Sequence, residues 1–82
     1  MFPATILERL QPIFHETFQD STIVVTESLS MADLAAWDSI GHMSLILAVE
    51  KAFGFQCTLE ELVDLDGVQD LIGLVERKLA AS

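Results

Sequence analysis

The sequence predicts an all-α fold, a small four-helix bundle of three longer helices and one short helix, with a long loop between the first and second helices. Apolar residues recur at helical spacing in three separate segments. Residues that favour helix starts precede these segments. The β-branched run Ile23-Val24-Val25 is too isolated to make a sheet. We take residues 1–82 as a single domain, since a chain of 82 residues can bury one modest core.

The first helix is expected to begin near Thr5, which forms a capping-box pattern with Glu8. Pro12 conflicts with an unbroken helix, because proline lacks the backbone N–H and disfavours helical backbone at the residue before it. Two alternatives follow: a kink at Pro12, or a loose turn that becomes regular only after Gln11. The buried face should consist of the apolar residues at helical spacing, which are Ile6, Leu10, Ile13, Phe14 and Phe18.

Residues 19–37 form a long connection, and a connection of this length is often functional. Ile23-Val24-Val25 should be an extended segment packed on the core. Residues 30–36 have the composition for one or two helical turns, with Ser30 as the cap and Asp33 at the third position. We expect this connection to deliver the chain to Asp38.

The second helix should run from about Ser39 to Phe53, with Asp38 as its N-cap and Gly54 just past its end. It carries two apolar stripes. The core-facing stripe consists of Leu45, Ile46, Val49, Ala52 and Phe53. The second stripe consists of Ile40, Met43 and Leu47, for which burial in the core and contact with a partner are both open.

Two more capping patterns predict the remaining helices. Thr58 with Glu61 opens a short helix, and Asp66 with Gln69 opens the last one. The core face of the last helix should consist of Val68, Leu71, Ile72, Val75 and Leu79. The single cysteine, Cys57, is interpreted as a small buried hydrophobe, and His15 and His42 as surface or edge histidines.

Charge and composition exclude several functions. The formal charge of −9 disfavours nucleic acid and an anionic membrane as partners, and it favours a basic protein surface. The alternative is that the acidity only keeps a small protein in solution. One cysteine allows no intramolecular disulfide and no multi-cysteine metal site. The N-terminus lacks a secretory pattern, so a cytoplasmic location is expected.

Asp38 and Ser39 form the most informative pair in the chain. A serine hydroxyl at a helix N-terminus is well placed to carry a phosphodiester, because unpaired N–H groups and the helix dipole favour an anion there. Both residue types also favour helix starts for purely structural reasons. The pair alone therefore does not decide between a modification site and an ordinary first helical turn.

The sequence from Asp38 to about Ile72 resembles the acyl carrier protein family. Asp38-Ser39-Ile40 is similar to the family's Asp-Ser-Leu, and the apolar run Leu45–Glu50 is similar to its second helix. Further points of similarity are Phe53, the pairs Val68-Gln69 and Leu71-Ile72, and Asp33-Leu34 ahead of the attachment site.

The resemblance implies that Ser39 carries 4′-phosphopantetheine, transferred from coenzyme A by a separate phosphopantetheinyl transferase. The thiol of this arm would hold an acyl group as a thioester. Asp38 would cap the helix and help to place the metal and coenzyme A in the transferase complex. The chain would be a monomeric carrier and not an enzyme. Its partners would include an acyl- or aminoacyl-loading ligase and downstream synthase or transferase enzymes of fatty-acid, polyketide or related secondary-metabolite biosynthesis.

Departures from the family pattern bear on the partner surface. Gly41, Ser44 and Lys51 stand where the family is often acidic. The predicted partner surface therefore combines the stripe Ile40, Met43 and Leu47 with the acidic residues Glu50, Glu60 and Glu61. This pattern favours a specialised stand-alone carrier over the housekeeping fatty-acid carrier.

Other functions remain open. An aminoacyl or peptidyl carrier is one, although Ala36-Trp37 does not fit the usual motif of peptidyl carriers. An acidic helical interaction module without a cofactor is another, and it predicts that Ser39→Ala leaves function intact. An enzyme is the third class. Trp37 is interpreted as a hydrophobic staple before the cap, with lining of the path of the arm or acyl chain as the alternative.

Overall fold

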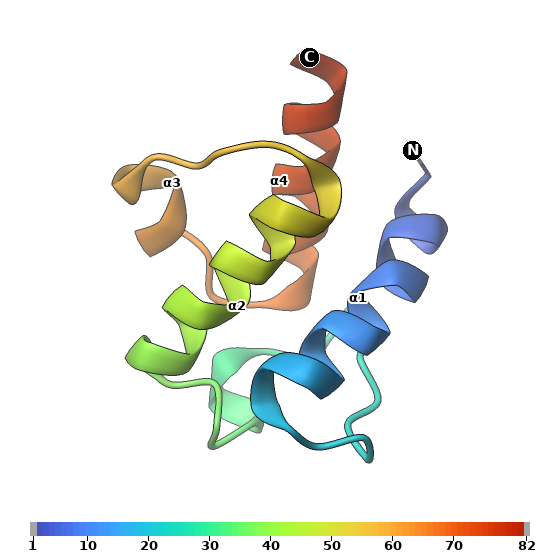
Figure 1. Cartoon of the computed structure of the whole chain (residues 1–82), viewed down its shortest axis with the longest axis vertical. Helices are drawn as coiled ribbons and strands as arrows, with labels where there is room; N and C mark the ends of the chain where they lie inside the picture. The colour runs from blue at the N-terminus through green and yellow to red at the C-terminus, as the bar shows by residue number, and fades with distance from the viewer. Residues whose placement is uncertain (1, 82) are drawn as a thin grey trace.

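The computed structural model describes residues 2–81 and confirms the all-α prediction. The elements in chain order are α1 (Pro3–Phe18), a 3₁₀ turn η1 (Met31–Asp33), α2 (Ser39–Phe53), α3 (Leu59–Val63) and α4 (Val68–Ala81). Figure 1 shows α1 and α2 in front of α4, with α3 on the side away from α1. The connection between α1 and α2 crosses one end of the bundle.

The start of α1 differs from the prediction. The helix begins at Pro3, so the expected start at Thr5 with its capping box to Glu8 is wrong. Proline suits the first helical position, because its fixed φ is already helical and its missing N–H would have had no partner there. The first helical hydrogen bond, from the Ile6 N–H to the Phe2 carbonyl, measures 3.0 Å. The helix continues through the exposed Pro12 to Phe18, so a loose turn before Gln11 is also wrong.

The core lies between α1, α2 and α4, with the long connection closing one end. Most predicted core positions are buried, but Ala52 of α2 is exposed, which corrects its assignment to the core stripe. Ile13, Phe18 and Leu79 are only half-buried. The fully or almost fully buried hydrophobic residues are Ile6, Leu10, Phe14, Ile23, Val25, Trp37, Leu45, Ile46, Val49, Phe53, Leu65, Val68, Leu71, Ile72, Leu74 and Val75.

The connection between α1 and α2 is fixed by specific hydrogen bonds. Ile23 and Val25 are buried while Val24 is 72% exposed, as expected for an extended segment on the core. The Gln11 side chain pairs with Val25 in both directions: its amide donates to the Val25 carbonyl at 2.7 Å and its oxygen accepts from the Val25 N–H at 2.9 Å. Ser30 donates from its N–H and its hydroxyl to the Asp33 carboxylate, both at 3.1 Å, which confirms it as the cap of η1.

The same connection is joined to the start of α4, and this explains a second correction. The helix begins at Val68, with its first hydrogen bond accepted by Gly67, so Asp66 is not its N-cap. The Val68 N–H donates instead to the Leu29 carbonyl at 2.8 Å. The Met31 N–H donates to the Asp66 carbonyl at 3.0 Å. The Leu29 carbonyl thus accepts a hydrogen bond from an N–H group in the first turn of α4, where the sequence predicted capping by the Asp66 side chain.

Helix α2 begins and ends as predicted. At its end, Gly54 adopts a left-handed backbone conformation with φ of 78°, and its N–H donates to the Glu50 carbonyl at 2.8 Å. Arg9 of α1 donates to the Ala52 carbonyl at 2.8 Å, and its guanidinium lies 4.3 Å from the centre of the Phe53 ring. A cation from α1 therefore interacts with the negative end of α2. Within residues 2–81, no helix is both long enough and apolar enough to cross a bilayer.

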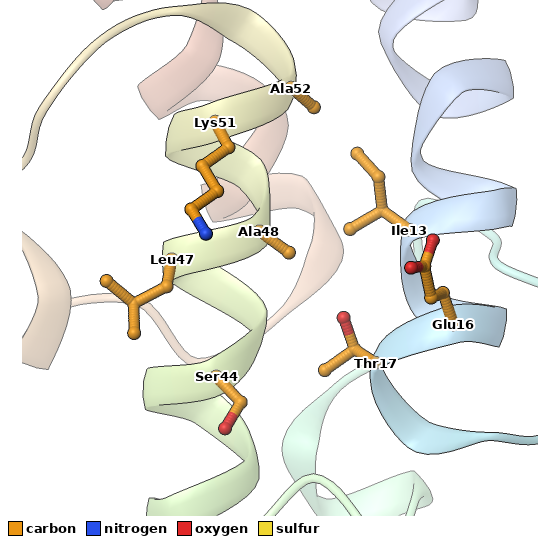
Figure 2. Close-up of a pocket in the computed structure, with 8 residues that line it drawn as sticks. All are labelled: Ile13, Glu16, Thr17, Ser44, Leu47, Ala48, Lys51 and Ala52. Atoms are coloured by element: carbon orange, nitrogen blue, oxygen red, sulfur yellow. The ribbon is translucent and has the colours of Figure 1, made fainter.

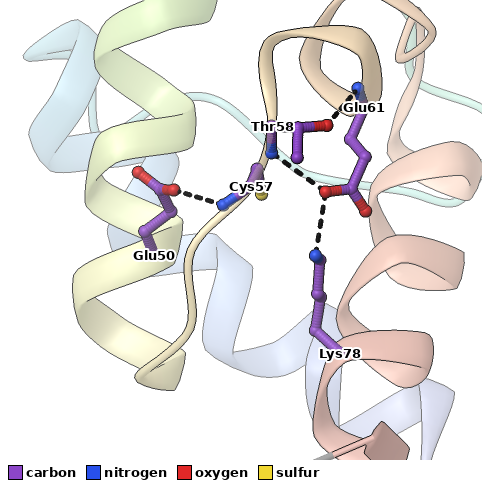
Figure 3. Close-up of polar contacts among 5 residues, drawn as sticks. All are labelled: Glu50, Cys57, Thr58, Glu61 and Lys78. Carbon is purple, nitrogen blue, oxygen red and sulfur yellow. Dashed lines mark hydrogen bonds and ion pairs between the residues drawn. The ribbon is translucent and has the colours of Figure 1, made fainter.

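None of the five residues of α3 is buried, and polar contacts join this helix to its surroundings. The predicted capping box is confirmed: the Glu61 N–H donates to Thr58 Oγ1 at 3.2 Å, and the Glu61 carboxylate accepts from the Thr58 N–H at 2.9 Å. Lys78 of α4 lies 2.8 Å from the same carboxylate. Just before α3, the Cys57 N–H donates to the Glu50 carboxylate of α2 at 2.6 Å. Figure 3 shows these contacts on both sides of α3.

The first turn of α2 packs so closely on its surroundings that only glycine fits at position 41. A Cβ added to Gly41 would collide with the Ala36 carbonyl oxygen and lie 2.9 Å from Cε1 of Phe18. We expect Gly41→Ala to lower the free energy of unfolding by about 2 kcal/mol, because overpacking exceeds the gain in helix propensity. Denaturant unfolding measures the change.

Gly73→Ala in α4 is the matched control, because the nearest atom to its added Cβ is Arg77 Nη1 at 3.8 Å. This variant should gain about 0.5–1 kcal/mol, the usual helix-propensity difference between glycine and alanine. Equal effects of the two substitutions would contradict the packing described for the first turn of α2.

The ionisation of Glu61 should make the free energy of unfolding depend on pH. Lys78, together with the Thr58 N–H, lowers the pKa of the Glu61 carboxyl below its ordinary value. Because the pKa of Glu61 is lower in the folded than in the unfolded state, the ionised carboxylate contributes to the free energy of unfolding. This contribution is complete above the unfolded pKa and is lost as pH falls through the folded pKa. The difference in melting temperature between the wild type and Glu61→Gln should therefore be largest near neutral pH and shrink below about pH 4. A constant difference from pH 7 to pH 3 would contradict this account.

Candidate functional site

Asp38 and Ser39 stand at the N-terminus of α2, as predicted. Asp38 has an extended backbone, and its Oδ1 accepts a hydrogen bond from the Gly41 N–H at 2.8 Å. The Asp38 carbonyl accepts from the His42 N–H at 2.7 Å, which closes the first turn. Ser39 is the first helical residue and is exposed. Its hydroxyl therefore lies at the positive end of the helix dipole and in contact with solvent.

Trp37 and His42 form a buried pair directly beneath this turn. Trp37 precedes the cap and His42 is the fourth helical residue, which are the two positions of a hydrophobic staple. Their rings stack with centroids 6.1 Å apart, and the side chains are only 2% and 6% exposed. The staple interpretation of Trp37 is confirmed. The prediction of a surface or edge histidine is wrong for His42.

Hydrogen bonds define the tautomer of His42. The Trp37 Nε1–H donates to His42 Nδ1 at 2.9 Å, so the ring proton belongs to Nε2. This Nε2–H donates to the Leu62 carbonyl of α3 at 3.0 Å. Phe14 of α1 meets the Trp37 ring edge-on, with centroids 5.2 Å apart. The first turn of α2 is thus connected to α1, to the long connection and to α3 through two buried side chains.

A signal for the burial of His42 was present in the sequence. His42 precedes Leu45 by three positions and Ile46 by four, so it lies on the core face of α2. A search for apolar residues at helical spacing leaves this position out, because histidine is a polar residue. The structure resolves the conflict by pairing both ring nitrogens.

The second stripe of α2 is exposed, and the alternative of burial in the core is wrong. Ile40 is 79% exposed, Met43 54% and Leu47 57%. Leu59 and Val63 of α3 are also exposed. An apolar surface of this kind on a small chain is typical of a contact site for another molecule.

The three acidic residues predicted to belong to the partner surface differ in their surroundings. Glu60 is exposed on α3. Glu50 is half-buried and accepts from the Cys57 N–H, while Glu61 is paired with Lys78. Two of the three carboxylates therefore also have a structural role, and Glu60 is the exposed one.

An open groove of about 580 Å³ lies between α1 and α2. Figure 2 shows Ile13, Glu16 and Thr17 on the α1 side and Ala48 pointing toward them from α2, with Lys51 on the front of α2 and Leu47 on the side away from α1. Ser44 and Ala52 complete its lining, which includes no histidine and no cysteine. The groove therefore offers apolar contact area and opposite charges on its two walls, without a nucleophile and base in its lining.

Cys57 is a half-buried thiol that packs against the core, partly as predicted. Burial raises its pKa above the ordinary value, and the nearby charges of Glu50 and Glu61 raise it further. A raised pKa leaves little thiolate at neutral pH, and the thiolate is the reactive form. Cys57 is therefore a poor nucleophile in the folded protein.

Comparisons with known proteins agree with this architecture. No protein-family model matches the sequence. The chain is similar to an acyl carrier protein of Thermosynechococcus vestitus, with 35% identity over 99% of this chain and 100% of the relative. It is similar to acyl carrier protein 2 of Ralstonia nicotianae, with 32% identity over 99% of this chain and 100% of the relative.

A solved structure supports the same assignment. The solution NMR structure of holo acyl carrier protein from Geobacter metallireducens superimposes with a TM-score of 0.83 and 44% sequence identity. The match covers 92% of this chain and 86% of the NMR structure's chain. Together, the full-length similarity, the shared fold and the capped serine at the start of α2 show that this chain belongs to the acyl carrier protein family.

Proposed function

We propose that Ser39 is the attachment point of a covalent 4′-phosphopantetheine arm, on which the chain carries acyl groups as thioesters. The observation that carries the proposal is the exposed Ser39 hydroxyl at the capped N-terminus of a fifteen-residue helix. A phosphodiester there is favoured by the helix dipole and by unpaired N–H groups of the first turn. Asp38 holds the turn through its bond to Gly41. The arm would supply a flexible thiol for thioester chemistry.

The surroundings of Ser39 fit an attachment point more than a catalytic centre. His42, the nearest histidine in sequence, has both ring nitrogens in hydrogen bonds to Trp37 and Leu62, so neither nitrogen is available as a base for Ser39. The Cys57 thiol has a raised pKa, so a thiol on the arm would be the more reactive one. The protein would act as a substrate and shuttle for other enzymes, which is the role expected of the family.

The partner enzymes are expected to contact α2 and α3. A phosphopantetheinyl transferase, a loading ligase for acyl or aminoacyl groups, and downstream synthase or transferase enzymes are the proposed partners. The stripe Ile40, Met43 and Leu47 supplies apolar contact, and Glu60 supplies an exposed negative charge. Gly41, Ser44 and Lys51 make this face less acidic than is typical of the family, which supports a specialised carrier with its own partners. A cytoplasmic location stays a prediction.

Loading at Ser39 is tested by intact-protein mass after incubation with coenzyme A, magnesium and a broad-specificity phosphopantetheinyl transferase. The wild type should gain one phosphopantetheine, and Ser39→Ala should gain none. Ser44→Ala is the matched control, because Ser44 is another exposed serine of α2, and it should be loaded like the wild type. Loading of Ser39→Ala would show that another residue is the attachment site. A folded wild type that gains no mass with several transferases would favour the interaction module without a cofactor.

The partner surface is tested by Met43→Glu. Met43 is 54% exposed, so the melting temperature should barely change. The kcat/KM for loading by the transferase should fall roughly tenfold, the usual scale for the loss of a central apolar contact. Val24→Glu introduces the same charge at an exposed site outside α2 and α3, and it should leave loading unchanged. A large loss of stability in Met43→Glu, or equal loading of both variants, would contradict the assigned surface.

A further inference from the structure

The groove between α1 and α2 is a part of the surface for which the proposed function provides no occupant. It is open to solvent, has a volume of about 580 Å³ and is lined by half-buried and exposed residues of both helices. Ser39 is not among these residues, and α3 lies on the side of the molecule away from α1. Exposed apolar groups gathered in a concave surface are typical of a contact site for another molecule.

The groove carries one acidic and one basic residue, Glu16 of α1 and Lys51 of α2. Both side chains are exposed. Within residues 2–81 the structure has one ion pair, between Lys78 and Glu61, so Glu16 and Lys51 are not paired with a charge of the same chain. Because the whole chain has thirteen acidic and four basic residues, a surface with one charge of each sign is an exception on it. Two copies of this acidic chain can therefore meet at the groove without bringing like charges together.

The two walls of the groove carry matching kinds of side chain. Each wall has a charged group that lies, in Figure 2, between an apolar group at one end and a hydroxyl group at the other. A two-fold rotation about an axis along the groove places the α1 wall of one copy opposite the α2 wall of another, so each group meets its complement. The α1 wall consists of Ile13, Glu16 and Thr17, and the α2 wall includes Ala52, Ala48, Lys51 and Ser44.

We propose that the groove between α1 and α2 is a self-association site, at which two copies of the chain form a weak symmetric dimer. In this dimer, the Glu16 carboxylate of each copy pairs with the Lys51 ammonium of the other copy, and the apolar groups of both walls supply contact area. Because both copies use the same surface, the association closes at two copies and does not continue into a polymer. The inference does not rest on the attachment at Ser39, since the unmodified chain already carries the whole surface.

The size and charge of the surface set the strength of this dimer. The eight residues that line the groove in each copy are fewer than the roughly 20–30 residues per partner of a stable interface. Exposed ion pairs add little free energy of association, and the formal charge of −9 on each copy opposes association. We therefore expect a dissociation constant of about 0.1–1 mM, with monomers predominating at micromolar concentration.

Sedimentation velocity of the unmodified full chain, from micromolar to millimolar concentration, tests the proposal. The weight-average mass of the wild type should rise with concentration toward twice the monomer mass. Lys51→Glu places two carboxylates opposite each other in the dimer, and Glu16→Lys places two ammonium groups opposite each other. Each variant alone should therefore associate about tenfold more weakly or less, because like charges that face each other oppose contact. Both positions are exposed, so neither substitution should disturb folding.

A mixture of the two variants assigns the dimer to this pair of residues. In a heterodimer of Lys51→Glu with Glu16→Lys, opposite charges face each other at both contacts, so an equimolar mixture should associate about as strongly as the wild type. Glu76→Lys is the matched control, because Glu76 is exposed on α4 outside the groove and its variant has the same net charge as Glu16→Lys. Glu76→Lys alone should associate no more weakly than the wild type. Its mixture with Lys51→Glu should associate more weakly than the complementary mixture.

Chemical-shift changes locate the contact in the same mixture. Isotope-labelled Lys51→Glu, titrated with unlabelled Glu16→Lys, should show changes at the backbone amides of α1 and α2 around the groove. A wild type that stays monomeric at millimolar concentration overturns the proposal. Association that persists in both single variants, or shift changes confined to α3, also overturns it, because another surface would then be responsible. Loading at Ser39 is measured separately, so its failure and the failure of this inference are distinguishable.

Discussion

The hydrogen bond between Trp37 and His42 is the constraint around which the other elements are arranged. It places a tryptophan N–H and an imidazole in the interior of a very small protein, where unpaired polar groups are expensive. Both are satisfied, and within residues 2–81 no buried side-chain nitrogen or oxygen lacks a partner. Because His42 also reaches Leu62 and Trp37 meets Phe14, this one pair fixes the start of α2 relative to α1 and α3. The position of Ser39 depends on that arrangement.

Local signals predicted the fold where local chemistry decides it. The bounds of α2 were predictable because Asp38 and Gly54 each satisfy the backbone of their own helix end. The capping boxes of η1 and α3 follow from side chains three residues apart. The starts of α1 and α4 were mispredicted for different reasons. Pro3 extends the first helix beyond its apolar pattern, and the Leu29 carbonyl, distant in sequence, replaces a side-chain cap at Val68.

The candidate site was predictable in part for the same reason. Asp38 and Ser39 lie at a helix start that the sequence defines, and the stripe of α2 was visible as a second apolar period. The structural roles of Glu50 and Glu61 were not visible, because they depend on Cys57 and Lys78 being brought close by the fold. The burial of His42 has the same origin, since its acceptor on α3 is twenty residues away. Spacing shows which face a residue occupies, but only the tertiary structure shows what it meets there.

The backbone pairing between the long connection and the start of α4 has a consequence for the timing of maturation. Ser30 and Gly67 form an isolated antiparallel bridge between segments that are far apart along the chain. A contact of this kind cannot form before both segments have been synthesised, and it requires that the long intervening chain be closed into a loop at a cost in conformational entropy. The part of the connection around residues 29–31 therefore gains these backbone bonds only when the start of α4 is in place. During synthesis, a ribosome-bound chain that lacks α4 would present an unfinished surface to a modifying enzyme, so prosthetic-group attachment would follow folding and select for completed molecules.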